Sequence, residues 1–171
     1  LFISTEAVGK KGYMNWGQIK DVEKESFAYI GNHSHSHDYL TKFTFKNFVE
    51  DIEKSIKIFN DKLGYNPSFF SYPFGEYNLE QKNYVSNNFE FAFGQHSGVI
   101  DLNKDRYELP RFPINEKYGE LKRFKEVISY LPLQYKIVKP ENKFMNDGEN
   151  PPNMTIEFFK DQKNLENINC F

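Results

Sequence analysis

Segments with the pattern of a β-strand alternate with segments with the pattern of an α-helix along most of this 171-residue chain. The clearest helix has apolar residues at helical spacing and ends before Gly64 and Pro67; its apolar positions are Phe45, Phe48, Val49, Ile52, Ile56 and Phe59. Short apolar runs that indicate strands lie on either side of it. Such alternation predicts an α/β fold, either a parallel sheet or a barrel, with functional loops at the carboxyl ends of the strands.

The remaining elements follow from the same patterns. We predict strands at 1–4, 27–31, 68–72, 89–93 and 107–114, and further helices at 15–26, 78–86 and 118–130. After Pro132 the pattern changes to strands alone, at 134–139, 155–160 and 165–171. We therefore divide the chain into an α/β domain at 1–132 and a small β-strand extension at 133–171.

The charge distribution, the apolar runs and the cysteine count of the sequence limit what the chain can bind and where disulfides can form. The 22 Lys and Arg residues are interspersed among 24 Asp and Glu residues, so the sequence predicts no face for nucleic acid or for an acidic membrane. No run of eighteen apolar residues occurs, so we expect no transmembrane segment. The one cysteine, Cys170, cannot form an internal disulfide.

Three of the four histidines lie within five positions, in the segment His33-Ser34-His35-Ser36-His37 that follows a predicted strand. In an extended segment all three imidazoles share a face, whereas a helical turn after His33 pairs His33 with His37. Either geometry can supply two nitrogens to one metal ion. The alternative is a solvated polar loop whose histidines only form hydrogen bonds.

This segment resembles the second motif of the polysaccharide deacetylases, the NodB-homology domain of carbohydrate esterase family four, whose pattern is His-Ser/Thr-x-x-His. The resemblance implies that His33 and His37 are metal ligands, with Zn²⁺ the expected divalent ion, and that His35 occupies a variable position. It also implies an incomplete (β/α) barrel of the deacetylase type over 1–132.

Two further segments resemble motifs of the same family. Phe70-Ser-Tyr-Pro-Phe-Gly-Glu-Tyr77 is similar to the third motif, which implies that the Phe74 backbone N–H helps to hold an oxyanion; the alternative is a plain β-turn. Leu109-Pro-Arg-Phe-Pro-Ile114 is similar to the strand whose arginine orients a catalytic carboxylate, here Arg111, and the alternative is a surface arginine. We also expect aromatic and turn residues near these motifs to contact the substrate, namely Trp16, Tyr72, Pro73 and Tyr77.

The sequence departs from the family pattern at two points. Members carry a first motif, Thr-Phe-Asp-Asp, that supplies the general base and a third metal ligand, and no Asp-Asp pair occurs here. The family's Leu-x-His, the usual source of the general acid, is also absent, which leaves His96 as the candidate acid or as a loop histidine without catalytic role. We therefore expect the chain to be a fragment of a longer protein, N-terminally truncated and weakly active or inactive.

The resemblance predicts a metal-dependent hydrolase that removes acetyl groups from a polysaccharide of N-acetylglucosamine type, acting at the cell envelope or outside the cell. One alternative is a non-catalytic carbohydrate-binding module whose aromatic loops hold sugar, and another is a hydrolase of small cyclic amides. The stacking candidates of the binding module are Tyr13, Trp16, Tyr39, Tyr72, Phe74 and Tyr77. The absent first strand predicts an exposed sheet edge, and through it a homodimer.

Overall fold

The computed structural model describes residues 1–145, 147–161, 163 and 165–167. The described chain forms two compact units. The first unit comprises residues 1–95 together with 105–109, and the second comprises 96–104 together with the residues from 110 onward.

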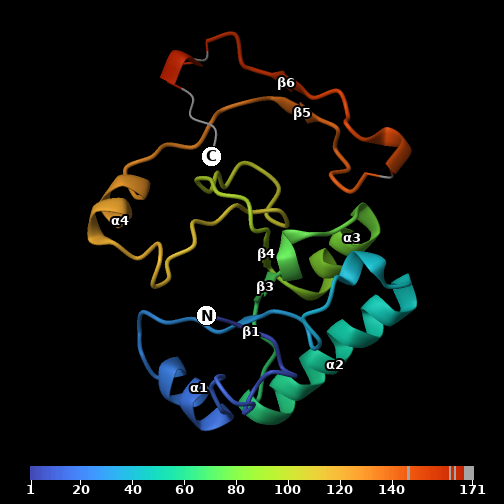
Figure 1. Ribbon diagram of the computed structural model, residues 1–171, viewed down its shortest axis with the longest axis vertical. Coiled ribbons are helices and arrows are strands. Elements are labelled where there is room, and N and C mark those ends of the chain that lie inside the picture. The colour runs from blue at the N-terminus through green and yellow to red at the C-terminus, as the bar shows by residue number, and fades with distance from the viewer. Residues whose placement is uncertain (146, 162, 164, 168–171) are drawn as a thin grey trace. The chain divides into compact units, whose positions relative to one another are not determined.

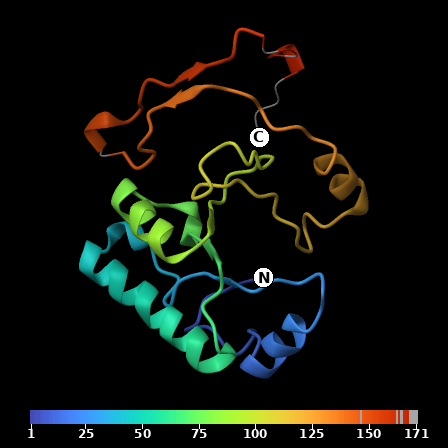
Figure 2. The same cartoon turned by 180° about the vertical axis from the view of Figure 1, so that it is seen from behind.

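A four-stranded parallel sheet organises the first unit. Its strands are β1 (Phe2–Ile3), β2 (Gly31–Asn32), β3 (Phe69–Ser71) and β4 (Phe91–Phe93), and they pair in chain order. The register places Ile3 opposite Asn32, and Asn32 opposite Phe70. A helix connects each strand to the next, as parallel pairing requires. These helices lie below the strands and to one side of them in Figure 1, and in the view from behind in Figure 2.

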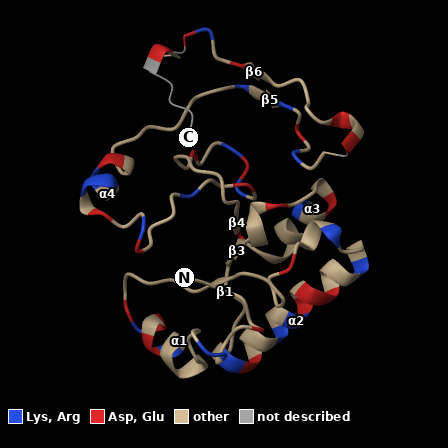
Figure 3. Ribbon diagram, viewed as in Figure 1, with Lys and Arg blue, Asp and Glu red and all other residues tan. Residues whose placement is uncertain are grey.

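The three connecting helices begin and end where their sequences predict. In α1 (Trp16–Glu23) and α3 (Leu79–Asn88), Asn15 and Asn78 each form a capping box with the glutamine three residues later. The long helix α2 (Phe45–Leu63) starts at the N-cap Thr44 and ends at Gly64, which adopts the left-handed conformation that glycine tolerates best. The ribbon in Figure 3 shows that acidic and basic residues alternate with other residues along α2.

Two groups of buried residues form the core of the first unit. The larger one lies between the sheet, α2 and α3, and its members are Leu40, Phe48, Ile52, Phe70, Tyr72, Tyr77, Val85, Phe89 and Ala92. The smaller one is formed by Ile3, Ile19, Ile30 and Phe59, with Trp16 packed against it. Full burial of such a side chain contributes about 1.5–3 kcal/mol, so α2, which supplies residues to both groups, ties the unit together.

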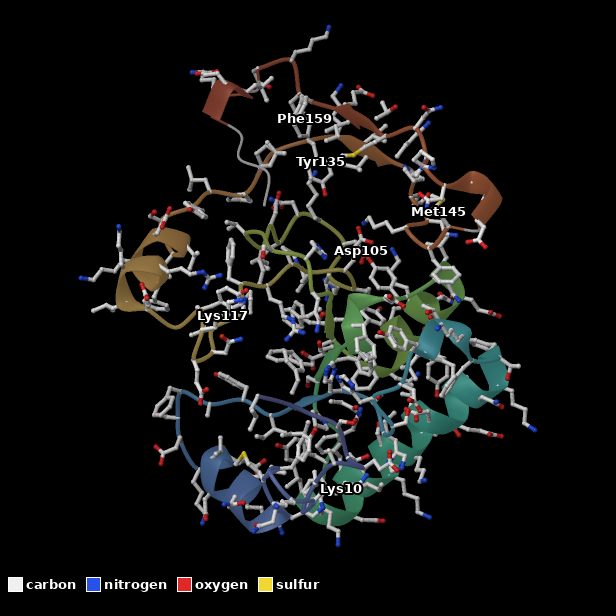
Figure 4. All side chains as sticks on the ribbon, viewed as in Figure 1. Lys10, Asp105, Lys117, Tyr135, Met145 and Phe159 are labelled. Atoms are coloured by element: carbon white, nitrogen blue, oxygen red, sulfur yellow. The ribbon has the colours of Figure 1, made fainter. Side chains whose placement is uncertain are left out.

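The second unit contains α4 (Leu121–Val127) and an antiparallel pair, β5 (Ile137–Lys139) and β6 (Thr155–Glu157). In this unit the Lys104 ammonium lies 3.9 Å from the centroid of the Tyr135 ring and 5.9 Å from that of Phe159, a cation–π arrangement. Figure 4 labels both rings. No helix in the described part of the chain is long and apolar enough to cross a membrane.

The α/β class and the parallel sheet of an incomplete (β/α) barrel are confirmed. The prediction of a strand over 107–114 is wrong, because only Leu109 forms an isolated parallel bridge, to Phe93. Pro110 and Pro113 have no N–H to donate to a ladder, which explains the difference.

Three other boundaries differ from the prediction. The strand expected at 27–31 is a turn followed by β2, and the Phe27 and Tyr29 side chains are exposed. The helix expected at 118–130 is limited to α4. Of the strand expected at 165–171, residues Leu165–Asn167 form a 3-10 turn, and 168–171 lie outside the described residues.

Candidate active site

The carboxyl ends of the parallel strands bring the motif residues of the first unit together. His33 follows β2 directly, Tyr72 follows β3, and Thr5 follows β1 by one residue. Parallel strands end at one edge of their sheet, where side chains from different strands converge. Motifs that are far apart in the sequence therefore meet at one edge of the sheet, because each follows a strand.

His33 and His37 form a close pair at this edge. Their ring centroids lie 4.7 Å apart with an interplanar angle of 76°. The His33 Nδ1–H donates to the Ser71 carbonyl oxygen at 2.7 Å, because a carbonyl can only accept. This bond places the lone pair of a neutral imidazole on Nε2, the arrangement of a histidine that ligates a metal.

Phe74 lies beside the histidine pair in a strained turn. It is the middle residue of the 3-10 turn Pro73–Gly75 and has a φ of 57°, in the left-handed region. Its ring centroid is 5.0 Å from that of His37, and it stacks on Tyr39 at 4.0 Å with an interplanar angle of 7°. Tyr39 and Phe74 keep 45% and 36% of their surface exposed, so the stack borders solvent next to the His pair.

The backbone N–H groups of this turn differ in whether they donate a hydrogen bond. The Gly75 N–H donates to the Tyr72 carbonyl at 2.9 Å, and the Glu76 N–H donates to the Pro73 carbonyl at 3.2 Å. No described residue accepts a hydrogen bond from the Phe74 N–H. A fixed backbone donor of this kind can stabilise negative charge on an oxygen bound near it.

A network of buried polar side chains binds the backbone of the histidine segment. Asn32 and Ser55 exchange hydrogen bonds of 2.8 and 3.1 Å between their side chains, and the Ser34 N–H donates to Asn32 Oδ1 at 2.9 Å. The Asp51 carboxylate, on the same helix as Ser55, accepts the next two N–H groups of the segment. Buried polar groups of this kind are stable only when each finds a partner.

His35 faces away from the pair and contacts the loop after β1. Its Nδ1 is 2.8 Å from Thr5 Oγ1. Burial lowers the pKa of His35, and the positive charge of Lys54 lowers it further, against the opposing effect of Asp51. The neutral imidazole is therefore favoured at this position.

A cavity of about 540 Å³ opens beside the His pair. The first fourteen residues provide much of its wall, and His33, Ser36 and His37 line one side. This volume is typical of small-ligand sites. Among the residues that the structure describes, no third His, Cys, Asp or Glu joins the pair in a group able to hold a metal. The donors present fit part of a divalent-metal site, whose catalytic zinc form has three protein ligands.

Four residues predicted to contact sugar lie mainly in the core. Tyr72 is 1% exposed and Tyr77 is 8% exposed, and each hydroxyl is bonded, to the Tyr107 carbonyl and to Glu108 respectively. Pro73 is buried as well, and Trp16 packs edge-on against Phe59 at 5.8 Å. These side chains position the turn and α1, whereas Tyr39 and Phe74 beside the His pair, and Tyr13 in the cavity wall, have exposed aromatic rings.

The other two predicted residues belong to the second unit. The Arg111 N–H donates to the His96 carbonyl at 3.0 Å, so the two residues are neighbours there. Burial lowers the pKa of the Arg111 guanidinium from its ordinary value. A guanidinium still stays protonated at any physiological pH.

Sequence reasoning missed the role of α2 in the site. Asp51 lies on the buried face of this helix, which it shares with Phe48, Ile52 and Ser55. A carboxylate at a core-facing position of an amphipathic helix rarely stays without a partner. That signal was present in the sequence.

The comparisons agree with the motifs. The sequence model of the family described as polysaccharide deacetylase matches residues 1–92, more than half of the chain. No curated protein matches the sequence.

Solved structures show the same fold at low identity. A structure of IcaB from Ammonifex degensii is 20% identical with a TM-score of 0.58, over 68% of this chain and 56% of that one. The Streptococcus pyogenes deacetylase PplD, in complex with acetate, is 15% identical with a TM-score of 0.66, over 74% and 57%. BC0361, a polysaccharide deacetylase from Bacillus cereus, is 18% identical with a TM-score of 0.64, over 74% and 40%. The chain thus spans about half the length of these proteins or less, and its family match and motifs show that it belongs to the polysaccharide deacetylase family.

Proposed function

We propose that the chain carries part of the active site of a metal-dependent hydrolase that removes acetyl groups from an N-acetylglucosamine-type polysaccharide. The observation that carries this proposal is the His33–His37 pair, with ring centroids 4.7 Å apart, and the Phe74 ring 5.0 Å from that of His37. The family supports the reaction class, and the acetate in the PplD structure has the chemistry of the expected product. Polymers of this kind belong to the cell envelope or to exported material, which is where we place the activity.

In this proposal His33 and His37 hold a divalent ion, with Zn²⁺ as the first candidate. The hydrogen bond from His33 to the Ser71 carbonyl fixes the ring and its tautomer, as it does for metal-bound histidines in general. When bound, such an ion polarises the acetyl carbonyl and lowers the pKa of water. A third ligand and a general base are what the family's Asp-Asp motif supplies, and this sequence contains no such pair.

Phe74 has two functions in the proposal. Its backbone N–H donates to the oxygen of the acetyl group as negative charge develops there, and one such donor contributes about 3 kcal/mol. Its ring, stacked on Tyr39, offers an apolar surface to the sugar next to the reacting group. For Arg111 and His96, which belong to the second unit, the sequence resemblance alone supports the predicted roles of carboxylate orientation and proton donation to the leaving amine.

A second candidate function is sugar binding without turnover. The exposed Tyr39–Phe74 stack favours it, as does the absence of a third ligand beside the histidine pair among the residues that the structure describes. The two functions differ in one observable, because only a hydrolase releases acetate.

The experiment compares acetate release from N-acetylglucosamine oligomers, with added Zn²⁺, by this chain and by a polypeptide in which a Thr-Phe-Asp-Asp strand precedes Leu1. We expect the chain alone to be nearly inert, since positioned proton transfer alone contributes about 10²–10⁴-fold. The extended polypeptide should release acetate and lose this activity on His33→Ala. Equal rates for both polypeptides, each abolished by His33→Ala, would mean that a carboxylate present in this chain acts as the base. Oligomer binding without acetate release by either polypeptide would favour the binding module.

A further inference from the structure

The Asp51 carboxylate contacts the backbone between the two site histidines. Asp51 Oδ1 accepts the His35 N–H at 2.9 Å, and Oδ2 accepts the Ser36 N–H at 3.0 Å. Asp51 is 9% exposed and lies in the middle of α2, a 19-residue helix. Two successive N–H groups that converge on one carboxylate form strong, charge-assisted hydrogen bonds.

The segment that Asp51 holds is strained. Ser34 and His37 have φ values of 66° and 59°, both left-handed and both on residues other than glycine. Each such residue costs about 1–3 kcal/mol and persists only where its surroundings impose it. Asp51 binds the two residues between these strained positions, so it supplies part of the constraint that keeps both in place.

The two histidines depend on this constraint to different extents. His33 is fixed independently, because its N–H donates to the Ile3 carbonyl at 2.9 Å and its ring donates to Ser71. The His37 N–H donates to Ser34 Oγ at 3.1 Å, a contact within the strained segment itself. The Ser34 and His35 carbonyls also accept hydrogen bonds from the loop after β1, from Thr5 N–H at 3.2 Å and Glu6 N–H at 3.0 Å. Release of the amides at 35 and 36 therefore weakens the constraint on His37, while His33 stays fixed.

We infer that Asp51 is a positioning residue that sets the separation of the His33 and His37 imidazoles and so makes them a bidentate metal site. This inference rests on the proposed function for the metal and goes beyond it in naming what holds the site together. Asp51 acts through the backbone of residues 35 and 36.

The test uses the full chain, with Asp51→Asn as the main variant. The amide side chain keeps nearly the same shape, but its NH₂ group faces a backbone N–H, so one of the two bonds is lost. Glu50→Gln is the matched control, because it makes the same chemical change one position away at a solvent-exposed site on α2. Asp51→Glu, which restores the carboxylate, is the rescue variant.

Two readouts are needed. Amide hydrogen exchange reports whether residues 35 and 36 are protected, with the α2 amides as the measure of folding. Cu²⁺ alone is the metal probe, because Cu²⁺ binds nitrogen ligands more tightly than Zn²⁺ does, and its electron paramagnetic resonance counts the coordinated nitrogens. The signal that persists in the His33→Ala/His37→Ala double variant is subtracted as binding elsewhere.

We expect protected amides at 35 and 36 and a two-nitrogen Cu²⁺ site in the unsubstituted chain and in Glu50→Gln. Asp51→Asn should lose this protection at one or both of the two amides while α2 keeps its own, change the signal to one nitrogen, and weaken Cu²⁺ binding by about 10–100-fold. Asp51→Glu should restore the two-nitrogen signal.

Other outcomes overturn the inference. Rapid exchange of the amides at 35 and 36 in the unsubstituted chain would by itself overturn the inference. A two-nitrogen site of unchanged affinity in Asp51→Asn, with both amides exchanging rapidly, shows that Asp51 does not position the ligands. Protected amides at 35 and 36 with no two-nitrogen signal in the unsubstituted chain contradict the proposed metal site and leave Asp51 as a brace for the loop alone.

Discussion

Replacement of Ser34 by alanine and by glycine separates two contributions of this side chain to the folded loop. Ser34 is fully buried, its hydroxyl oxygen accepts the His37 N–H at 3.1 Å, and its φ of 66° is left-handed. Alanine removes the acceptor, keeps the strain, and should lower the free energy of unfolding by about 1–2 kcal/mol.

Glycine removes the same acceptor but relieves the strain. The left-handed conformation costs a residue with a Cβ about 1–2 kcal/mol, and the greater freedom of glycine in the unfolded chain offsets about 0.5–1 kcal/mol of that gain. Ser34→Gly should therefore be more stable than Ser34→Ala by about 0.5–1 kcal/mol. The predicted order of stability is serine, then glycine, then alanine.

Urea unfolding monitored by the fluorescence of Trp16 provides the assay. Trp16 is the one tryptophan of the chain and packs against Phe59, so its signal follows the first unit. Ser36→Ala is the control, because the Ser36 hydroxyl accepts only the exposed Asp38 N–H, and it should change stability by less than about 0.5 kcal/mol. A glycine variant less stable than the alanine variant would refute the argument from strain.

Three further predictions concern packing, charge and assembly. Gly31→Ala places a Cβ 2.5 Å from the Phe2 ring, and we expect a loss of about 1–3 kcal/mol in the same urea assay. Burial lowers the pKa of Lys82, but the hydrogen bond to Asp105 and the charge of Glu108 outweigh this effect and raise it overall. The Lys82 ammonium therefore contributes to the free energy of unfolding below pH 10.5, and this contribution is lost as the pH rises through the folded-state pKa. Lys82→Met should lower the free energy of unfolding by about 1–2 kcal/mol at pH 7 and by less above pH 10.5. Because β1 is an edge strand of the described sheet, sedimentation should detect a dimer, and a strictly monomeric chain would contradict pairing through that edge.

Local signals predicted much of the fold. Asn15, Asn78 and Gly64 limit their helices as their residue types indicate, because capping depends on neighbours within a few positions. The strand predicted over 107–114 was expected to tolerate its prolines as an edge strand, but it forms only an isolated bridge at Leu109, because Pro110 and Pro113 have no N–H for a ladder.

The candidate site was predictable only in part. The spacing of His33 and His37 and the Pro73-Phe74 turn are visible in the sequence. The Tyr39–Phe74 stack and the contact of Asp51 with residues 35 and 36 depend on where α2 and the turn lie in space. Such tertiary contacts join residues far apart in sequence, and no local pattern fixes their geometry.

Calorimetric titration of the chain with Zn²⁺ tests the central claim, that His33 and His37 form the metal-binding part of the site, most directly. With two neutral ligands and no carboxylate between them, we predict a dissociation constant weaker than about 1 µM, that is, less than about 8 kcal/mol of binding free energy. The binding heat should disappear in the His33→Ala/His37→Ala double variant. Binding at micromolar affinity or tighter that survives both substitutions would contradict the account.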